Sequence, residues 1–167
     1  FDSDKTVYLF TINKKVIATF ELEDEIKDNA QNLIKFLQEK NIEVVMLTGD
    51  NEKVASRIAK QLNINKYFST QTPISKANYI KELKKQNKIV VMVGDGVNDS
   101  VALSSADVAI AMGNSADVSL AISDVVLLNS TLSSLQDAFL ISNKTYKFIK
   151  QNLGLSILYN MVTIPLA

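Results

Sequence analysis

Signals for strands and helices alternate along the chain from residue 24 to about residue 150, and this alternation constrains the fold more than any other feature. Apolar residues at helical spacing separate short apolar runs, of which 42–47 and 88–93 are the clearest. Short apolar runs between helices are typical of strands that are buried in a parallel sheet. The sequence therefore predicts an α/β fold, a Rossmann-like parallel sheet with helices on both faces.

Each end of the chain adds a different element. Residues 6–12 and 15–22 are rich in Val, Ile, Phe and Thr and flank a short polar turn, which predicts an N-terminal β-hairpin. A long helix is expected to begin near Ser130, and residues 153–167 contain no charged side chain. This apolar C-terminal helix fits either a buried core helix or the beginning of a transmembrane helix.

The composition excludes several kinds of chemistry. The 167 residues include no cysteine and no histidine, which excludes disulfides, a thiolate nucleophile, the usual zinc sites and a Ser-His-Asp triad. The 18 basic and 18 acidic residues give zero net charge, which argues against a nucleic-acid partner. Any catalysis must therefore depend on carboxylates, lysines, hydroxyl groups, amides and the backbone.

One polar loop, 94–99, carries two carboxylates directly after a predicted strand. Asp95 and Asp99 lie in this loop with Gly96 between them. Ligands of parallel sheets bind at the carboxyl ends of the strands, and Mg²⁺ binds one or two carboxylates together with water and phosphate oxygens. The loop therefore predicts a Mg²⁺ site, with an ordinary turn of solvated aspartates as the alternative.

A second polar loop, Thr48-Gly49-Asp50, lies between a predicted strand and a predicted helix. Its hydroxyl and backbone N–H groups suit an anion, because unpaired donors and the helix dipole both favour negative charge at a helix N-terminus. Capping of the helix by Asp50 or Asn51 is the simpler alternative.

Lys76 is a candidate phosphate ligand. It follows Ser75, which we expect to cap a helix over 76–86. The helix dipole does not favour a lysine at a helix start, so a charge-neutralising role is reasonable. The alternative is a solvated lysine, since lysines are frequent in this part of the chain.

Five runs of sequence resemble, in order and spacing, the haloacid-dehalogenase-like phosphorylation domain of P-type cation-transporting ATPases: MLTGDN, PISK, VMVGDGVNDS, ADVAIAMG and SDVVLL. The resemblance implies three parts. Residues 1–23 would be a β-hairpin from the end of the nucleotide-binding domain, and residues 24–150 the phosphorylation domain without its first motif. Residues 151–167 would begin a transmembrane helix.

The resemblance also implies roles at the Mg²⁺ site. Asp95 would bind Mg²⁺, while Asn98 and Asp99 would order the site around it. ATP would be the phosphoryl donor in the full-length enzyme.

Four further residues would act on the phosphoryl group. By the same resemblance, Thr48 and Gly49 would contact it, Asp50 would organise their loop and Lys76 would neutralise its charge. This combination fits phosphoryl transfer, in which catalysis is mainly positioning and charge neutralisation.

The C-terminal run resembles the heavy-metal branch of the family. Tyr159-Asn160 matches a pair that Cu(I)-transporting members use to bind the transported metal, which implies a metal-binding role only in the intact membrane domain. The parent protein would lie in a plasma or inner membrane, with residues 1–150 in the cytoplasm.

Three departures from the family pattern affect the expected activity. Ser75 replaces an aspartate before the lysine, and Ser100-Val101 replaces Ala-Pro. The family's phosphorylated aspartate lies in Asp-Lys-Thr-Gly-Thr, and the 167 residues contain no such run. We therefore expect this chain to be inactive alone and to require the missing N-terminal part of the same ATPase.

Two alternatives remain from the sequence. Asp2 and Asp4 loosely fit the first motif of the superfamily, which would make the chain a free-standing Mg²⁺-dependent phosphatase. The other alternative is that the chain is a truncated, non-catalytic fragment. A missing first strand and an exposed apolar tail predict self-association.

Overall fold

A computed structural model describes residues 6–22, 25–94, 99–113, 121–129 and 131–166. The chain divides into two compact units, Phe1–Leu132 and Ser133–Ala167, and each is described by itself.

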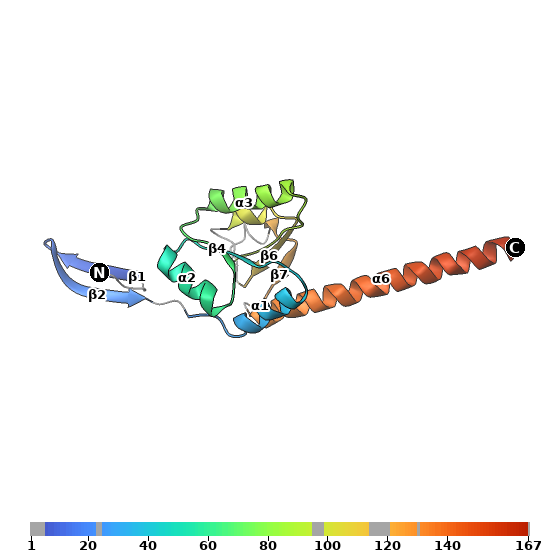
Figure 1. The fold of residues 1–167 in the computed structure, drawn as a ribbon, viewed down its shortest axis with the longest axis horizontal. Helices are drawn as coiled ribbons and strands as arrows, with labels where there is room; N and C mark the ends of the chain where they lie inside the picture. The colour runs from blue at the N-terminus through green and yellow to red at the C-terminus, as the bar shows by residue number, and fades with distance from the viewer. Residues whose placement is uncertain (1–5, 23–24, 95–98, 114–120, 130, 167) are drawn as a thin grey trace. The chain divides into compact units, whose positions relative to one another are not determined.

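An antiparallel hairpin forms the first element of the fold (Figure 1). Strands β1 (Thr6–Ile12) and β2 (Lys15–Leu22) are joined by Asn13 and Lys14, whose φ angles are 49° and 62°. Positive φ at both central residues matches the right-handed twist of the strands, which explains why a two-residue turn suffices. The predicted hairpin is confirmed at both strands and at the turn.

Five short parallel strands form two sheets. One sheet pairs β3 with β4, and the other has the order β5-β6-β7. Their bounds are β3 Val45–Leu47, β4 Lys66–Phe68, β5 Val91–Gly94, β6 Val108–Met112 and β7 Val125–Leu127. Within the described residues, β3 and β5 each pair on one side only, so that each has an unpaired edge.

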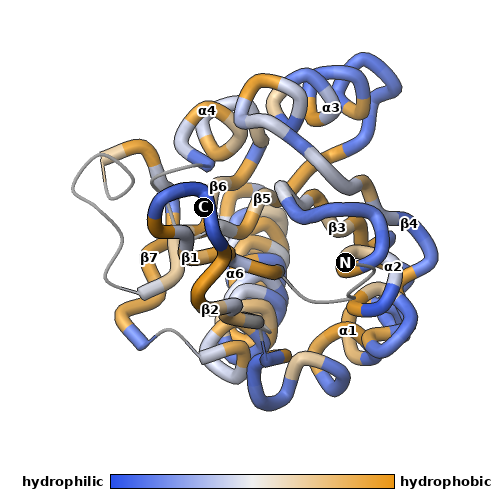
Figure 2. The backbone as a smooth tube through the Cα atoms, turned by 90° about the vertical axis from the view of Figure 1, so that its left-hand side faces the viewer, coloured by the Kyte–Doolittle hydropathy of each residue, from blue (hydrophilic) through white to orange (hydrophobic). Residues whose placement is uncertain are grey.

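Helices cover both faces of these strands. Figure 2 shows α3 and α4 on one side and α1 and α2 on the other. Their bounds are α1 Ala30–Glu39, α2 Glu52–Gln61, α3 Pro73–Lys85 and α4 Ser100–Leu103. Ile80 and Leu103 are the largest fully buried side chains, and they come from neighbouring helices α3 and α4. The predicted α/β architecture is therefore confirmed.

A carboxylate lies just before each of two strands in the second sheet, β6 and β7. Asp107, just before β6, accepts the backbone N–H of Val90 at 2.8 Å, and Asp124, just before β7, accepts that of Ala109 at 2.8 Å. These contacts satisfy backbone donors of the neighbouring strand, which would otherwise be left unpaired at the sheet's end.

The second unit consists of the long helix α6 (Leu132–Leu166) from its second residue onward, with Pro165 inside the helix. The helix expected from near Ser130 is confirmed, and it continues without a break through residues 150 and 151. Among the helices that the structure describes, none contains a stretch both long and apolar enough to cross a membrane.

Candidate phosphate and magnesium site

The ion pair between Lys76 and Asp99 is the centre of the candidate site. Nζ of Lys76 lies 2.7 Å from Oδ1 of Asp99, and the two side chains are only 13% and 14% exposed. Asp99 immediately precedes α4 but makes no side-chain capping bond to it, since its carboxylate faces Lys76 on α3. Two residues that are 23 positions apart are therefore brought together with their charges paired.

Gly94, the last residue of β5, lies directly against the Asp99 side chain. A Cβ atom at position 94 would be 2.9 Å from both Cβ and Oδ2 of Asp99. Such a distance is shorter than real side-chain contacts, so only glycine fits here without a shift. The close approach fixes Asp99 at the carboxyl end of β5.

The loop after β3 is organised by a reciprocal pair of hydrogen bonds. The Thr48 hydroxyl donates to Oδ2 of Asp50 at 2.6 Å and accepts the Asp50 backbone N–H at 3.1 Å. Asn51 caps α2 instead, because its side-chain oxygen accepts the N–H of Val54 at 3.0 Å. Of the two capping alternatives, the structure selects Asn51, and the Asp50 carboxylate instead bonds the Thr48 hydroxyl.

Backbone contacts connect this loop to the start of α3. The carbonyl of Thr48 accepts the N–H of Gln71 at 2.8 Å, and the carbonyl of Asp50 accepts that of Thr70 at 2.7 Å. Thr72 follows and is the N-cap of α3, in whose first turns Lys76 lies. The described residues therefore form a continuous path of contacts from Thr48 through α3 to Asp99.

The expectation that Ser75 caps the helix is wrong. The helix begins at Pro73, and Thr72 is its N-cap, in a capping box in which Ser75 supplies the third-position side chain. Oγ of Ser75 accepts the Thr72 N–H at 2.8 Å, and the Thr72 hydroxyl accepts the Ser75 N–H at 3.2 Å. A proline at the first helical position costs no hydrogen bond, which explains the earlier start.

Glu52 supports the loop and was not predicted from the sequence. Its carboxylate accepts the Ser69 hydroxyl at 2.6 Å and the Tyr67 hydroxyl at 2.8 Å. These hydrogen bonds, that of Ser69 first, lower the pKa of Glu52. The only sequence signal that Glu52 supports the loop is its position directly after the Asn51 cap. A glutamate at that position is ordinarily interpreted as stabilising the helix through its dipole.

Glu43 links the two sheets. Its carboxylate lies 2.8 Å from Nζ of Lys88, which precedes β5, and 3.3 Å from Nζ of Lys66 on β4. These contacts, that with Lys88 first, lower the pKa of Glu43. Tertiary structure alone brings Glu43 and Lys88 together, so their spacing in the sequence gave no indication of it.

Several predicted site residues lie outside the described residues: Asp2, Asp4, Asp95 and Asn98. Tyr159 and Asn160 lie on α6, where the Tyr159 side chain is exposed. Within the described ranges, no group of three or more acidic residues is arranged to hold a metal ion.

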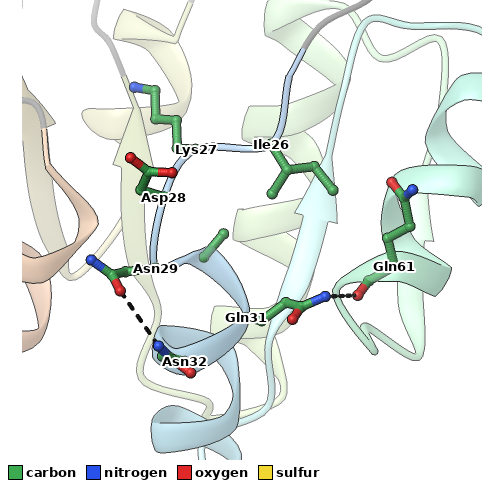
Figure 3. A pocket seen from close by; sticks show the side chains of 8 residues that line it. Ile26, Lys27, Asp28, Asn29, Gln31, Asn32 and Gln61 are labelled. Carbon is green, nitrogen blue, oxygen red and sulfur yellow. Dashed lines mark hydrogen bonds between the residues drawn. The ribbon is translucent and has the colours of Figure 1, made fainter.

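A pocket of about 320 Å³ lies elsewhere, around the start of α1 (Figure 3). Asn29 in a left-handed conformation precedes the helix, and Gln31 donates to the Gln61 carbonyl at 2.9 Å beside it. None of the predicted site residues lines this pocket.

Comparison with known proteins gives a consistent result. The haloacid dehalogenase-like hydrolase family matches residues 2–107. The probable copper-importing P-type ATPase A of Enterococcus hirae is 42% identical over 165 residues, 98% of this chain and 23% of that protein. Copper-transporting ATPase 1 of Mus musculus is 39% identical over 163 residues, 98% of this chain and 11% of that protein. The chain thus spans less than a quarter of the length of these relatives.

A solved structure extends the comparison to the fold. The crystal structure of a zinc-transporting PIB-type ATPase in its E2.Pi state superimposes with a TM-score of 0.78 at 32% identity, over 96% of this chain and 27% of that one. The expected haloacid-dehalogenase-like fold is confirmed.

Proposed function

The chain belongs to the haloacid dehalogenase-like hydrolase family, and from this premise we propose that it is the C-terminal catalytic portion of a heavy-metal-transporting P-type ATPase. It supplies the phosphate-binding and Mg²⁺-binding part of a site at which ATP phosphorylates an aspartate. The aspartate itself comes from another segment of the same transporter.

The interrupted sheet carries this proposal. Among the described residues, β3 and β5 each have an unpaired edge, and the Glu43–Lys88 ion pair connects the segments just before these two strands. Backbone donors and acceptors along an unpaired strand edge need partners, so we infer a strand between the two edges. A strand in that position would end beside two segments. One is the loop that begins at Thr48, and the other is the segment that follows Gly94.

The described residues suit a phosphoryl group with Mg²⁺. Lys76 offers a positive charge, and Thr48 offers a hydroxyl group in the loop between β3 and α2. Oδ1 of Asp99 pairs with Lys76, so Oδ2 is the oxygen that would order the site. Asp95 would hold the ion. Bound Mg²⁺ would neutralise charge on the phosphoryl oxygens.

Copper is the proposed transported ion, since the relatives reported above carry copper in their names. Tyr159 and Asn160 are the proposed ligands of this substrate. Adjacent residues on a helix point about 100° apart. Tyr159 and Asn160 could therefore share one ion only in a site that other membrane helices complete. The proposal places residues 151–167 in the membrane and residues 1–150 in the cytoplasm.

Reconstitution from two pieces tests the proposal. The chain is mixed with the upstream part of the transporter that carries Asp-Lys-Thr-Gly-Thr, and radiolabelled ATP is added with Mg²⁺. We expect an acid-stable phosphoprotein only in the mixture, with the label on the upstream piece. Lys76→Ala should abolish it, whereas Lys81→Ala, on the exposed side of α3, should not.

The opposite result is equally informative. Mg²⁺-dependent hydrolysis of p-nitrophenyl phosphate by the chain alone, lost on Asp2→Asn or Asp4→Asn, would replace the proposal with a free-standing phosphatase. A mixture that gains no phosphorylation would leave a non-catalytic fragment.

A further inference from the structure

We propose that residues 144–150 of α6 bind the headgroups of anionic phospholipids through Lys144, Lys147 and Lys150. This inference rests on the proposed function, which places the C-terminal end of α6 in a membrane. It adds the class of lipid and the residues that recognise it.

One side of α6 combines positive charge with an exposed aromatic ring. Lys144, Lys147, Phe148 and Gln151 line a common hollow on the helix surface. Their spacing of three, four and seven residues places them on one face of the helix. The Phe148 side chain is 63% exposed, so the face presents an apolar ring beside two lysines.

The third lysine is associated with a tyrosine. Nζ of Lys150 lies 4.5 Å from the centre of the Tyr146 ring, which is a cation–π contact. Tyrosine is enriched where a membrane meets water, because its ring is apolar and its hydroxyl is polar. Tyr146 and Lys150 therefore have the character of an interfacial anchor.

Charge complementarity identifies the occupant. The sequence contains no Asp or Glu from residue 138 to residue 167, whereas it contains three lysines there. No described carboxylate forms an ion pair with Lys144, Lys147 or Lys150. Basic residues beside a membrane helix attract anionic lipids, by about fivefold per residue.

The residues that follow favour a lipid headgroup over a free phosphate. Residues 151–167 are uncharged, and Leu153, Leu155 and Ile157 are exposed on the same helix. A soluble phosphate needs no apolar surface beside it, whereas a lipid headgroup has acyl chains immediately below it.

Vesicle co-sedimentation with the full chain tests the inference. The probes are vesicles of phosphatidylcholine alone and vesicles of an equimolar mixture with phosphatidylglycerol. We expect tighter binding to the anionic vesicles by about tenfold or more. The variant Lys144→Gln/Lys147→Gln/Lys150→Gln should lose this preference, while the charge-matched control Lys14→Gln/Lys60→Gln/Lys81→Gln should keep it.

Each contrary outcome has a distinct meaning. Equal binding of the wild-type chain to both kinds of vesicle, or an unchanged preference in the α6 variant, overturns the lipid inference alone. Binding to neither kind of vesicle overturns the proposed membrane helix as well. Loss of the preference in added sodium phosphate, but not in sodium chloride of the same ionic strength, would identify free phosphate as the ligand.

Discussion

The Lys76 ammonium and the Asp99 carboxylate lie 2.7 Å apart, and this contact joins α3 to the segment that follows β5. Both side chains are largely shielded from water, unlike those of the other ion pairs that the structure describes. Lys76 therefore both links these two parts of the fold and carries the positive charge of the candidate site.

Lys76→Met should destabilise the chain because it leaves the shielded Asp99 carboxylate without its partner. We expect a loss of about 1–3 kcal/mol in the free energy of unfolding, measured by urea denaturation. The double variant Lys76→Met/Asp99→Leu should recover part of this loss, since no charge then remains unpaired. Lys81→Met on the same helix is the matched control and should change little; a loss equal to that of Lys76→Met would contradict the prediction.

Gly94→Ala should also destabilise the fold. The added Cβ would lie 2.9 Å from Asp99, which must move, at a cost of about 1–3 kcal/mol. Gly154→Ala is the control, because no atom lies within 4 Å of its added Cβ. Alanine should stabilise that helical position by about 0.5–1 kcal/mol. Thermal unfolding should show a lower midpoint temperature for Gly94→Ala and a higher one for Gly154→Ala than for the unchanged chain.

Asp107→Ala should weaken the dependence of stability on acid pH. The Val90 N–H and then Lys84 lower the pKa of Asp107 below its ordinary value of 3.8. A lowered folded-state pKa contributes stability that is present above the unfolded-state value and is lost as pH falls through the folded-state value. Urea unfolding at a series of pH values below 5 should therefore show a shallower decline in the variant. An unchanged slope would refute this assignment.

Glu43→Gln should affect assembly more than stability. The Glu43–Lys88 pair is about half-exposed, so its loss should cost no more than about 1 kcal/mol of unfolding free energy. It joins the starts of β3 and β5, however, so the variant should bind the upstream segment several-fold more weakly in the two-piece phosphorylation assay. Glu82→Gln removes a similar exposed pair within α3 and should bind normally.

The isolated chain should self-associate as its concentration rises. Tyr8, Phe10 and Phe20 of the hairpin are each more than half exposed, and β3 and β5 have edges that no other described strand pairs with. Light scattering should report a mass that increases with concentration, and Phe10→Ser/Phe20→Ser should reduce it. A monomer at all concentrations without detergent would exclude these surfaces as sites of association.

The local elements of the fold could be predicted from the sequence because their signals are local. The turn at Asn13 and Lys14, for example, is visible within a few residues. The start of α3 differs from the predicted one because the chain carries two adjacent helix-start signals. The helix uses Thr72-Pro73, and Ser75 joins its capping box.

The candidate site could be predicted only as separate motifs. Nothing in the spacing indicates that Lys76 pairs with Asp99, since this contact depends on how α3 packs beside α4. The same holds for Glu43, whose partners Lys66 and Lys88 follow it by 23 and 45 residues. Contacts of this range are decided by tertiary packing, which a short sequence pattern does not record.

The unpaired edges of β3 and β5 have a consequence for biosynthesis. In the proposed transporter, the strand between them is translated before either neighbour. The strand can pair with β3 once residue 47 has emerged, but its other edge stays unpaired until residue 94 has left the ribosome. During this interval the unpaired edge is exposed to misassembly.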